Sequence, residues 1–143
     1  MKMLKTIPAL PVQNATAAAD FYREKFGFTI THQEDGFAIL NRDDIQIHLW
    51  GASDDGWKQR LQTTLAGSEA EMGYPVISGA ESFLAGTASC RIEVKGIDEL
   101  YTEYQTSGVL YNDNSKVEAQ PWGTREFPTL DLEGNLLTFF ERT

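Results

Sequence analysis

Apolar and polar residues alternate with a period of two along residues 45–50 and again along residues 89–95. Successive side chains of an extended strand point to opposite faces, so each run predicts a β-strand with one apolar and one polar face. The apolar positions are Ile45, Ile47, Leu49, Cys90, Ile92 and Val94. His48, Trp50 and Arg91 fall on the opposite faces of these two strands.

Two further stretches have the apolar spacing of an amphipathic helix. Residues 18–26 follow a cap at Asn14 or Thr16, and residues 97–104 begin around a cap at Asp98. Glycine often ends a helix because it adopts the left-handed backbone conformation readily. The two glycines expected to end these helices are Gly27 and Gly108.

The order of elements predicts an α+β fold. Further strands are expected at residues 4–12, 28–32, 37–40, 116–119, 125–130 and 136–141. Pro8 and Pro11 cannot donate to a strand ladder, so the first strand should be an edge strand or an arm. The result is one domain of two β-α-β-β-β units, about 4–50 and 87–142. The irregular connection 51–86 is either disordered or functional.

Composition narrows the classes of partner. The 143 residues carry a net charge of −9, which speaks against nucleic acid and anionic membranes, because both select basic surfaces. Acidity would favour a cationic ligand, although it also serves solubility in many proteins. The start lacks a signal-peptide core, no apolar run approaches a membrane span, and Cys90 is the single cysteine. We therefore expect a cytoplasmic protein.

The most distinctive stretch is Gln-Pro-Trp-Gly-Thr-Arg-Glu-Phe at residues 120–127. Pro121 and Gly123 mark a loop that presents Trp122 outside any strand period. Asp-Leu-Glu-Gly-Asn then predicts a hairpin turn at residues 131–135 before the last apolar run. These two motifs resemble the carboxy-terminal signature of bleomycin resistance proteins, members of the vicinal-oxygen-chelate superfamily of glyoxalases and dioxygenases.

The resemblance implies a fold of two repeated units and a homodimer with two clefts at its interface. It implies sequestration of bleomycin-type antibiotics, free or metal-loaded, with no catalytic residue and no cofactor. In that family a loop tryptophan matching Trp122 stacks on the bithiazole rings of the drug. The partner chain supplies the opposite plane from a residue matching His32, and Phe37 matches a cleft aromatic. The expected ligand-binding residues are Trp122, Gly123, His32, Phe37, His48, Trp50 and Arg91.

For three of these residues a structural role is an open alternative. Phe37 could be plain core packing, Trp50 could be covered by the connection 51–86, and His48 could form a cleft wall. Aromatic planes would gain from stacking on a flat ligand and from contact with a cation.

Enzymes of the superfamily use a metal ion, with ligands from the first and last strand of each unit. The matching positions here lie near Ala9, His48, Ser89 or Arg91, and Thr138. Only His48 is a good ligand, and Glu93 could add one carboxylate, whereas a catalytic metal typically needs three protein ligands. We expect no metal site, with Cys90 as a buried, inert thiol. Two functions are alternatives to the sequestration of an antibiotic. One is a metal-dependent enzyme acting on a small oxygenated substrate, and the other is a binding protein for another aromatic ligand.

Overall fold

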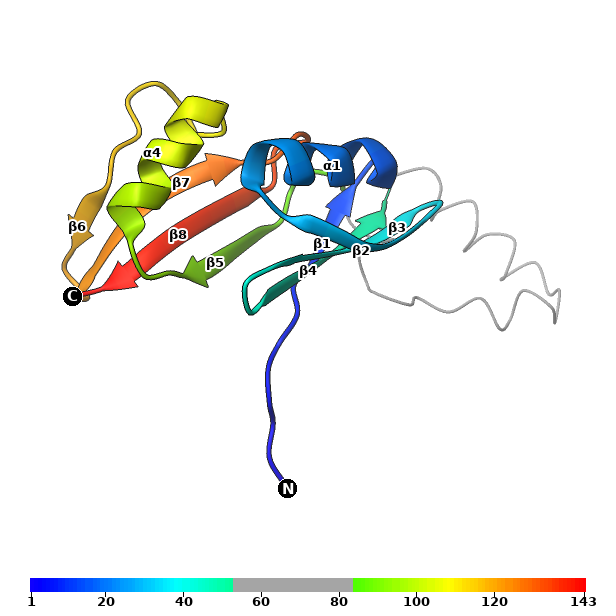
Figure 1. Cartoon of the computed structure of the whole chain (residues 1–143), viewed down its shortest axis with the longest axis horizontal. Helices are drawn as coiled ribbons and strands as arrows, with labels where there is room; N and C mark the ends of the chain where they lie inside the picture. The colour runs from blue at the N-terminus through cyan, green and yellow to red at the C-terminus, as the bar shows by residue number, and fades with distance from the viewer. Residues whose placement is uncertain (53–83) are drawn as a thin grey trace, which may run out of the picture.

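The computed structural model describes residues 1–52 and 84–143, which form two four-stranded sheets side by side (Figure 1). The elements of the first unit are β1 (Ala9–Val12), α1 (Ala15–Phe21), the π-helical turn η1 (Tyr22–Phe26), β2 (Thr29–Glu34), β3 (Phe37–Arg42) and β4 (Ile45–Gly51). Those of the second unit are β5 (Ser89–Glu93), α4 (Ile97–Ser107), β6 (Glu118–Gln120), β7 (Thr124–Leu130) and β8 (Leu136–Arg142). The connection predicted at 51–86 falls mainly outside the described residues.

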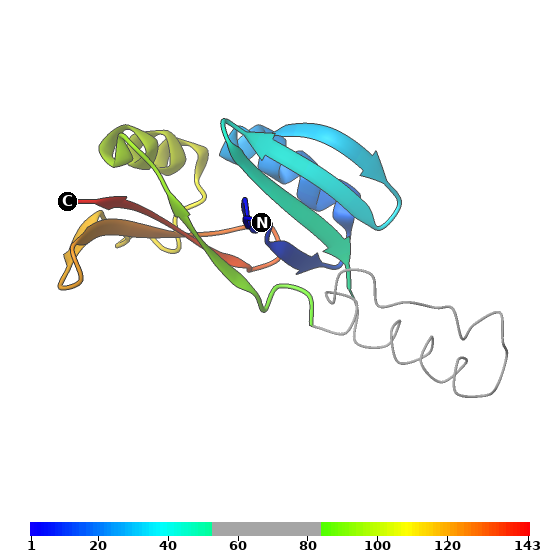
Figure 2. The same ribbon diagram turned by 90° about the horizontal axis from the view of Figure 1, so that it is seen from below.

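The two sheets repeat one topology, which confirms the predicted α+β fold of two β-α-β-β-β units. Their strand orders are β1-β4-β3-β2 and β5-β8-β7-β6. In each sheet the first strand pairs in parallel with the fourth, and the other pairs are antiparallel. Both helices lie on the same side of the sheets in Figure 1, and Figure 2 shows the strands of the first sheet in front of α1.

The first strand is shorter than its apolar content predicts. β1 begins at Ala9, not at residue 4, and it forms the edge of its sheet as Pro8 and Pro11 required. Residues 1–8 extend away from the sheets as an arm (Figure 1), and Met1, Met3 and Leu4 on it are exposed.

One of the two predicted helix caps is confirmed and the other is wrong. The Asn14 Oδ1 atom accepts a hydrogen bond from the Ala17 amide at 3.0 Å, so Asn14 is the cap and Thr16 is not. The second helix begins after Gly96, which has no capping side chain, and Asp98 lies in its first turn. The Asp98 carboxylate instead forms two hydrogen bonds with Arg125 of β7.

Gly27 and Gly108 end their helices in the left-handed region, at φ of 77° and 80°. Within the described ranges, no helix is both long and apolar enough to cross a membrane.

A continuous apolar core lies between the sheets and the helices and contains residues of both units. Phe26 at the end of η1 packs on Tyr104 of α4 and on Phe139 of β8, with ring centroids 5.1 and 6.4 Å apart. Arg42 of β3 also reaches α4, where it forms hydrogen bonds with the Glu103 carboxylate at 2.7 and 3.0 Å. The two repeats therefore pack against each other through their helices.

The hairpin at residues 131–135 joins the second unit to the first. The buried Asp131 carboxylate accepts hydrogen bonds from the Tyr22 hydroxyl and the Asn135 amide, both at 2.9 Å. Asn135 also donates to the Pro11 carbonyl at 3.0 Å. The Glu133 carboxylate accepts from the backbone amides that precede α1, at positions 13 and 14. The second half of the sequence signature thus acts as a structural joint between the units.

Candidate functional site

The faces of the two sheets that point away from α1 and α4 are called here the open faces. On the first open face, Phe37 of β3 lies opposite Trp50 of β4, and Ile39 lies opposite His48. The Phe37 ring has its centroid 4.3 Å from that of Trp50, 5.3 Å from that of His48 and 5.8 Å from that of His32. Four of the predicted site residues therefore form one aromatic cluster, His32, Phe37, His48 and Trp50.

His32 reaches the aromatic cluster because of an irregularity in β2. The pairing of β2 with β3 shifts between Ile30 and His32, so Ile30 pairs with Leu40 and His32 pairs with Ile39. In a regular strand, residues 30 and 32 would share a face. The β-bulge leaves Ile30 on the core side and turns His32 to the open face, where half of its side chain is exposed.

Two polar groups of the aromatic cluster differ in their hydrogen bonding. The His48 ring pairs through Nε2 with the Gln46 side chain at 3.1 Å, and burial lowers its pKa, which favours the neutral imidazole. The Trp50 indole nitrogen is buried and has no hydrogen-bond partner among the described residues. His48 and Trp50 therefore contribute uncharged aromatic surface to the cluster at neutral pH.

The second open face carries Trp122, which is 64% exposed at the turn between β6 and β7. Gly123 has a φ of 88°, a region that favours glycine, and its amide donates to the Gln120 carbonyl at 3.1 Å. This tight turn presents the indole outward. The Trp122 Nε1 atom donates to the Glu126 carboxylate at 3.1 Å.

Glu126 is the centre of a network that also includes Arg91, Trp122 and Thr124. Arg91 donates two hydrogen bonds to its two carboxylate oxygens, at 3.0 and 2.5 Å, and the Thr124 hydroxyl donates a third at 2.5 Å. The Arg91 guanidinium lies 4.6 Å from the ring centroid of Phe140, which pairs with Glu126 in the sheet. These donors, Arg91 first, lower the pKa of Glu126 to about 2. We call these four residues the Glu126 network.

The sequence did not single out Glu126, although a signal was present. β7 alternates, which places Glu126 and Pro128 on one face and the buried Phe127 and Thr129 on the other. A carboxylate on the open face beside the predicted Trp122 loop was thus visible in the pattern. The ion pair between Glu126 and Arg91 was not visible in the pattern. It depends on β8 lying between β5 and β7, which only the fold determines.

A hollow borders the Glu126 network. This pocket of about 420 Å³ lies between β7 and the loop that precedes β6. Its polar lining includes Asn112, Asn114 and Ser115 from that loop, and its floor includes Pro128 and Thr138 from the open face. Groups that donate and accept hydrogen bonds therefore line a hollow that also includes Glu126.

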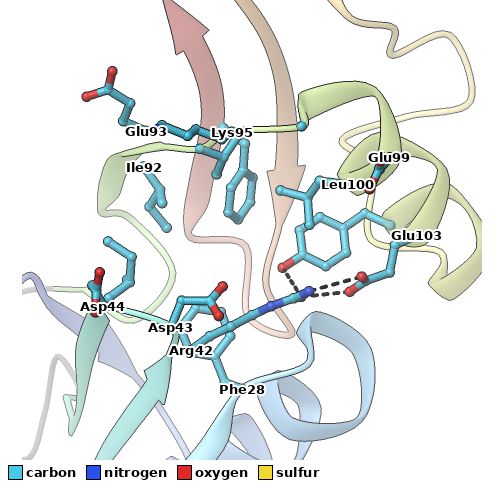
Figure 3. Close-up of a pocket in the computed structure, with 15 residues that line it drawn as sticks. Phe28, Arg42, Asp43, Asp44, Ile92, Glu93, Lys95, Glu99, Leu100 and Glu103 are labelled. Atoms are coloured by element: carbon cyan, nitrogen blue, oxygen red, sulfur yellow. Dashed lines mark hydrogen bonds and ion pairs between the residues drawn. The ribbon is translucent and has the colours of Figure 1, made fainter.

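A larger pocket, of about 470 Å³, lies between the units and contains none of the predicted site residues (Figure 3). Its apolar wall includes Phe28 and Ile92, and Figure 3 shows Arg42 extending across it to Glu103. Hydrogen bonds from Arg42 lower the pKa of Glu103, so this cation and anion neutralise each other. Arg42 therefore links the two units.

The strand register tests whether the residues fit the metal of the superfamily's enzymes. Ala9 lies opposite His48, and Arg91 lies opposite Thr138, so the four predicted positions do pair on the open faces. They offer a methyl group, an imidazole, a guanidinium that is bound to Glu126, and a hydroxyl. Across residues 1–52 and 84–143, no group of three His, Cys, Asp or Glu side chains is placed to hold an ion. This donor set does not fit a catalytic metal.

The remaining candidate groups are also engaged. The Glu93 carboxylate accepts a hydrogen bond from Arg142 at 2.9 Å. Burial raises the pKa of the half-buried Cys90 thiol to about 11, so the reactive thiolate is scarce at neutral pH. The prediction of an inert cysteine agrees with this environment.

Comparison with known proteins identifies relatives over almost the whole chain. A sequence model of the Glyoxalase/Bleomycin resistance protein/Dioxygenase superfamily matches residues 6–139. Proteins named bleomycin resistance protein from Geobacillus stearothermophilus and Staphylococcus aureus are each 47% identical over 140 residues, which is 98% of this chain and 98% of theirs.

Solved structures share the fold at lower identity. A bleomycin-binding protein from the bleomycin-producing Streptomyces verticillus, complexed with copper(II)-bleomycin, is 22% identical, with a TM-score of 0.66 over 97% of this chain and 96% of that one. A bleomycin resistance determinant encoded on the transposon Tn5 is 21% identical, with the same TM-score of 0.66 over 98% of both chains. By sequence and by fold, the chain belongs to the glyoxalase, bleomycin resistance protein and dioxygenase superfamily.

Proposed function

We propose that the protein binds and sequesters bleomycin-family glycopeptide antibiotics and does not modify them. The observation that carries this proposal is the pair of accessible aromatic surfaces, the exposed Trp122 on one open face and the partly exposed aromatic cluster on the other. Flat aromatic ligands gain free energy by stacking on such planes. The relatives named bleomycin resistance protein, at 47% identity, supply the class of ligand.

The site is proposed to be completed by a second copy of the chain. Trp122 and the aromatic cluster lie on different sheets, so a partner chain is needed to place one plane over the other. Half-buried Phe37 and Trp50 leave apolar surface on the open face, and the arm at residues 1–8 exposes Met3 and Leu4. A homodimer with two equivalent grooves would cover such surface. The arm is a candidate for exchange between the chains, although β1 itself pairs with β4 of its own chain.

Sequestration needs no catalytic residue, and residues 1–52 and 84–143 offer little for metal-dependent catalysis. The four strand positions that bear metal in the superfamily's enzymes carry Ala9, His48, Arg91 and Thr138. One imidazole among them does not support a metal-dependent mechanism. The net charge of −9 would instead favour the approach of a positively charged drug tail.

Calorimetric titration with metal-free and copper-loaded bleomycin tests the proposal. We expect saturable binding with one drug per chain, quenching of tryptophan fluorescence, and recovery of chemically unchanged drug by mass spectrometry. No binding at micromolar concentrations would refute sequestration. A modified drug, or a stoichiometric divalent ion in the purified protein, would favour the metal-dependent enzyme.

Light scattering tests the shared groove separately. A mass of two chains at micromolar concentration is expected, and a monomer that still binds the drug would refute the groove built from two chains.

A further inference from the structure

We propose that Glu126 is a positioning residue, which with Arg91 holds the Trp122 indole in its ligand-stacking orientation before the ligand arrives. This inference rests on the proposed function, because it concerns how the same site is prepared. It assigns a role to two charged residues that need not touch the drug themselves.

The first step is that packing alone does not fix Trp122. The residue is 64% exposed on a turn, so packing restricts rotation about its two side-chain bonds only weakly. The hydrogen bond from Nε1 to the Glu126 carboxylate, at 3.1 Å, supplies a directional restraint. A charged acceptor makes this restraint stronger than a neutral one would.

The second step is that Glu126 is itself held by its neighbours. Only 8% of the residue is exposed, and its carboxylate accepts from Arg91, Thr124 and Trp122. The fork of two hydrogen bonds from Arg91 fixes the plane of the carboxylate. Arg91 is held in turn over the Phe140 ring, so the restraint runs from the sheet to the indole.

The third step concerns the charge. A carboxylate in the site could have been a partner for the cationic drug tail. Here Arg91 already neutralises Glu126 and occupies both of its oxygens, so little acceptor capacity remains for a ligand. Positioning of Trp122 therefore accounts for this ion pair, in which Glu126 is buried and Arg91 is half-exposed, better than direct contact of Glu126 with the drug does.

An indole of Trp122 that is already ordered should raise the affinity for bleomycin. Ordering a free side chain on binding weakens the affinity by about 2- to 12-fold for each side chain immobilised. The variant Glu126→Gln keeps the size of the side chain but presents an amide to the Arg91 fork. We expect it to weaken bleomycin binding by about 2- to 12-fold, the amount that ordering Trp122 would account for.

Glu93→Gln is the matched control. Glu93 is a second carboxylate of the same sheet, it is paired with Arg142, and its replacement removes the same charge. This variant should bind bleomycin with nearly the affinity of the wild type. An equal loss in both variants would mean that net charge, not the position of Trp122, governs binding.

A double-mutant cycle separates positioning from sheet stability. In the background Trp122→Phe there is no indole N–H for Glu126 to hold, so adding Glu126→Gln should change affinity little further. If Glu126→Gln weakens binding equally in both backgrounds, Glu126 acts on the drug directly or through the sheet, and the proposal is overturned. Should Glu126→Gln fail to fold, Arg91→Lys keeps the charge, removes the planar fork, and takes its place in the cycle.

A measurement on the drug-free protein keeps the inference independent of the proposed function. Fluorine NMR of 5-fluorotryptophan-labelled protein, with the Trp122 resonance assigned by its loss in Trp122→Phe, reports the order of this one ring. The resonance should be that of an ordered ring in the wild type and in Glu93→Gln, and shifted and motionally averaged in Glu126→Gln. An unchanged resonance in Glu126→Gln would overturn the positioning role, whether or not the wild type binds bleomycin.

Discussion

Replacement of Tyr22 by phenylalanine tests the joint between the two units. Tyr22 is fully buried, and its hydroxyl donates to the Asp131 carboxylate at 2.9 Å. Phenylalanine keeps the ring that stacks on Phe26 at a centroid distance of 5.0 Å. The change therefore removes one hydrogen bond between the units and leaves the packing of the ring intact.

The expected loss follows from the partners that remain. A hydrogen bond to a charged group contributes about 1.5–3 kcal/mol to stability. In the variant, the Asp131 carboxylate still accepts from the Asn135 side chain and from the amides of Glu133 and Asn135. Because the carboxylate is not left without donors, we expect the lower end, about 1.5 kcal/mol. For a chain of this size, that corresponds to a fall in Tm of about 5 °C.

Urea denaturation followed by circular dichroism measures this loss. The midpoint should fall while the slope with denaturant stays unchanged, since the same surface is exposed on unfolding. Tyr111→Phe is the control, because Tyr111 is 53% exposed and the variant should stay within about 0.5 kcal/mol of the wild type. A Tyr22→Phe variant as stable as this control would show that the hydrogen bond from Tyr22 to Asp131 does not stabilise the fold.

Alkaline pH gives a second test of the same group. Burial, and then the Asp131 charge, raise the pKa of Tyr22 well above its ordinary value. The unfolded chain therefore loses this proton first, so the contribution of Tyr22 is fully present below pH of about 10 and is lost as pH rises further. Tyr22→Phe should show a shallower decline of stability above pH of about 10.

Three further predictions concern the proposed binding site. Trp122→Ala should weaken bleomycin binding by about 5- to 150-fold, which corresponds to a stacking loss of about 1–3 kcal/mol. The Tm should change little because Trp122 is exposed. If the variant still protects cells from the drug as well as the wild type does, the site lies elsewhere. His32→Phe should tighten binding in the same titration, since a phenyl ring has no nitrogens to desolvate, and unchanged affinity would remove His32 from the site. The association rate in stopped-flow should fall with added salt and then level off, because exposed charges are screened over about 8 Å. A rate that does not change with salt would mean that the net charge of −9 serves solubility and not binding.

The sequence by itself determined most of the local structure. Alternation along β4 placed Ile47 and Leu49 in the core and His48 and Trp50 on the open face, because an extended backbone directs successive side chains to opposite sides. Gly27 ended its helix as predicted, because the left-handed conformation is a property of the residue and its neighbours. Such features depend on short-range geometry, which a local pattern contains.

Only the tertiary structure decided which distant residues meet. Asp98 has the chemistry of a helix cap, yet its carboxylate binds Arg125, which β7 brings beside it. The bulge that turns His32 to the open face has no clear local signature, because pairing with β3 fixes the register. Glu126 meets Arg91 across 35 positions because β8 lies between their strands. Ion pairs and register depend on which strands are neighbours, and that is settled by burial of the whole apolar core.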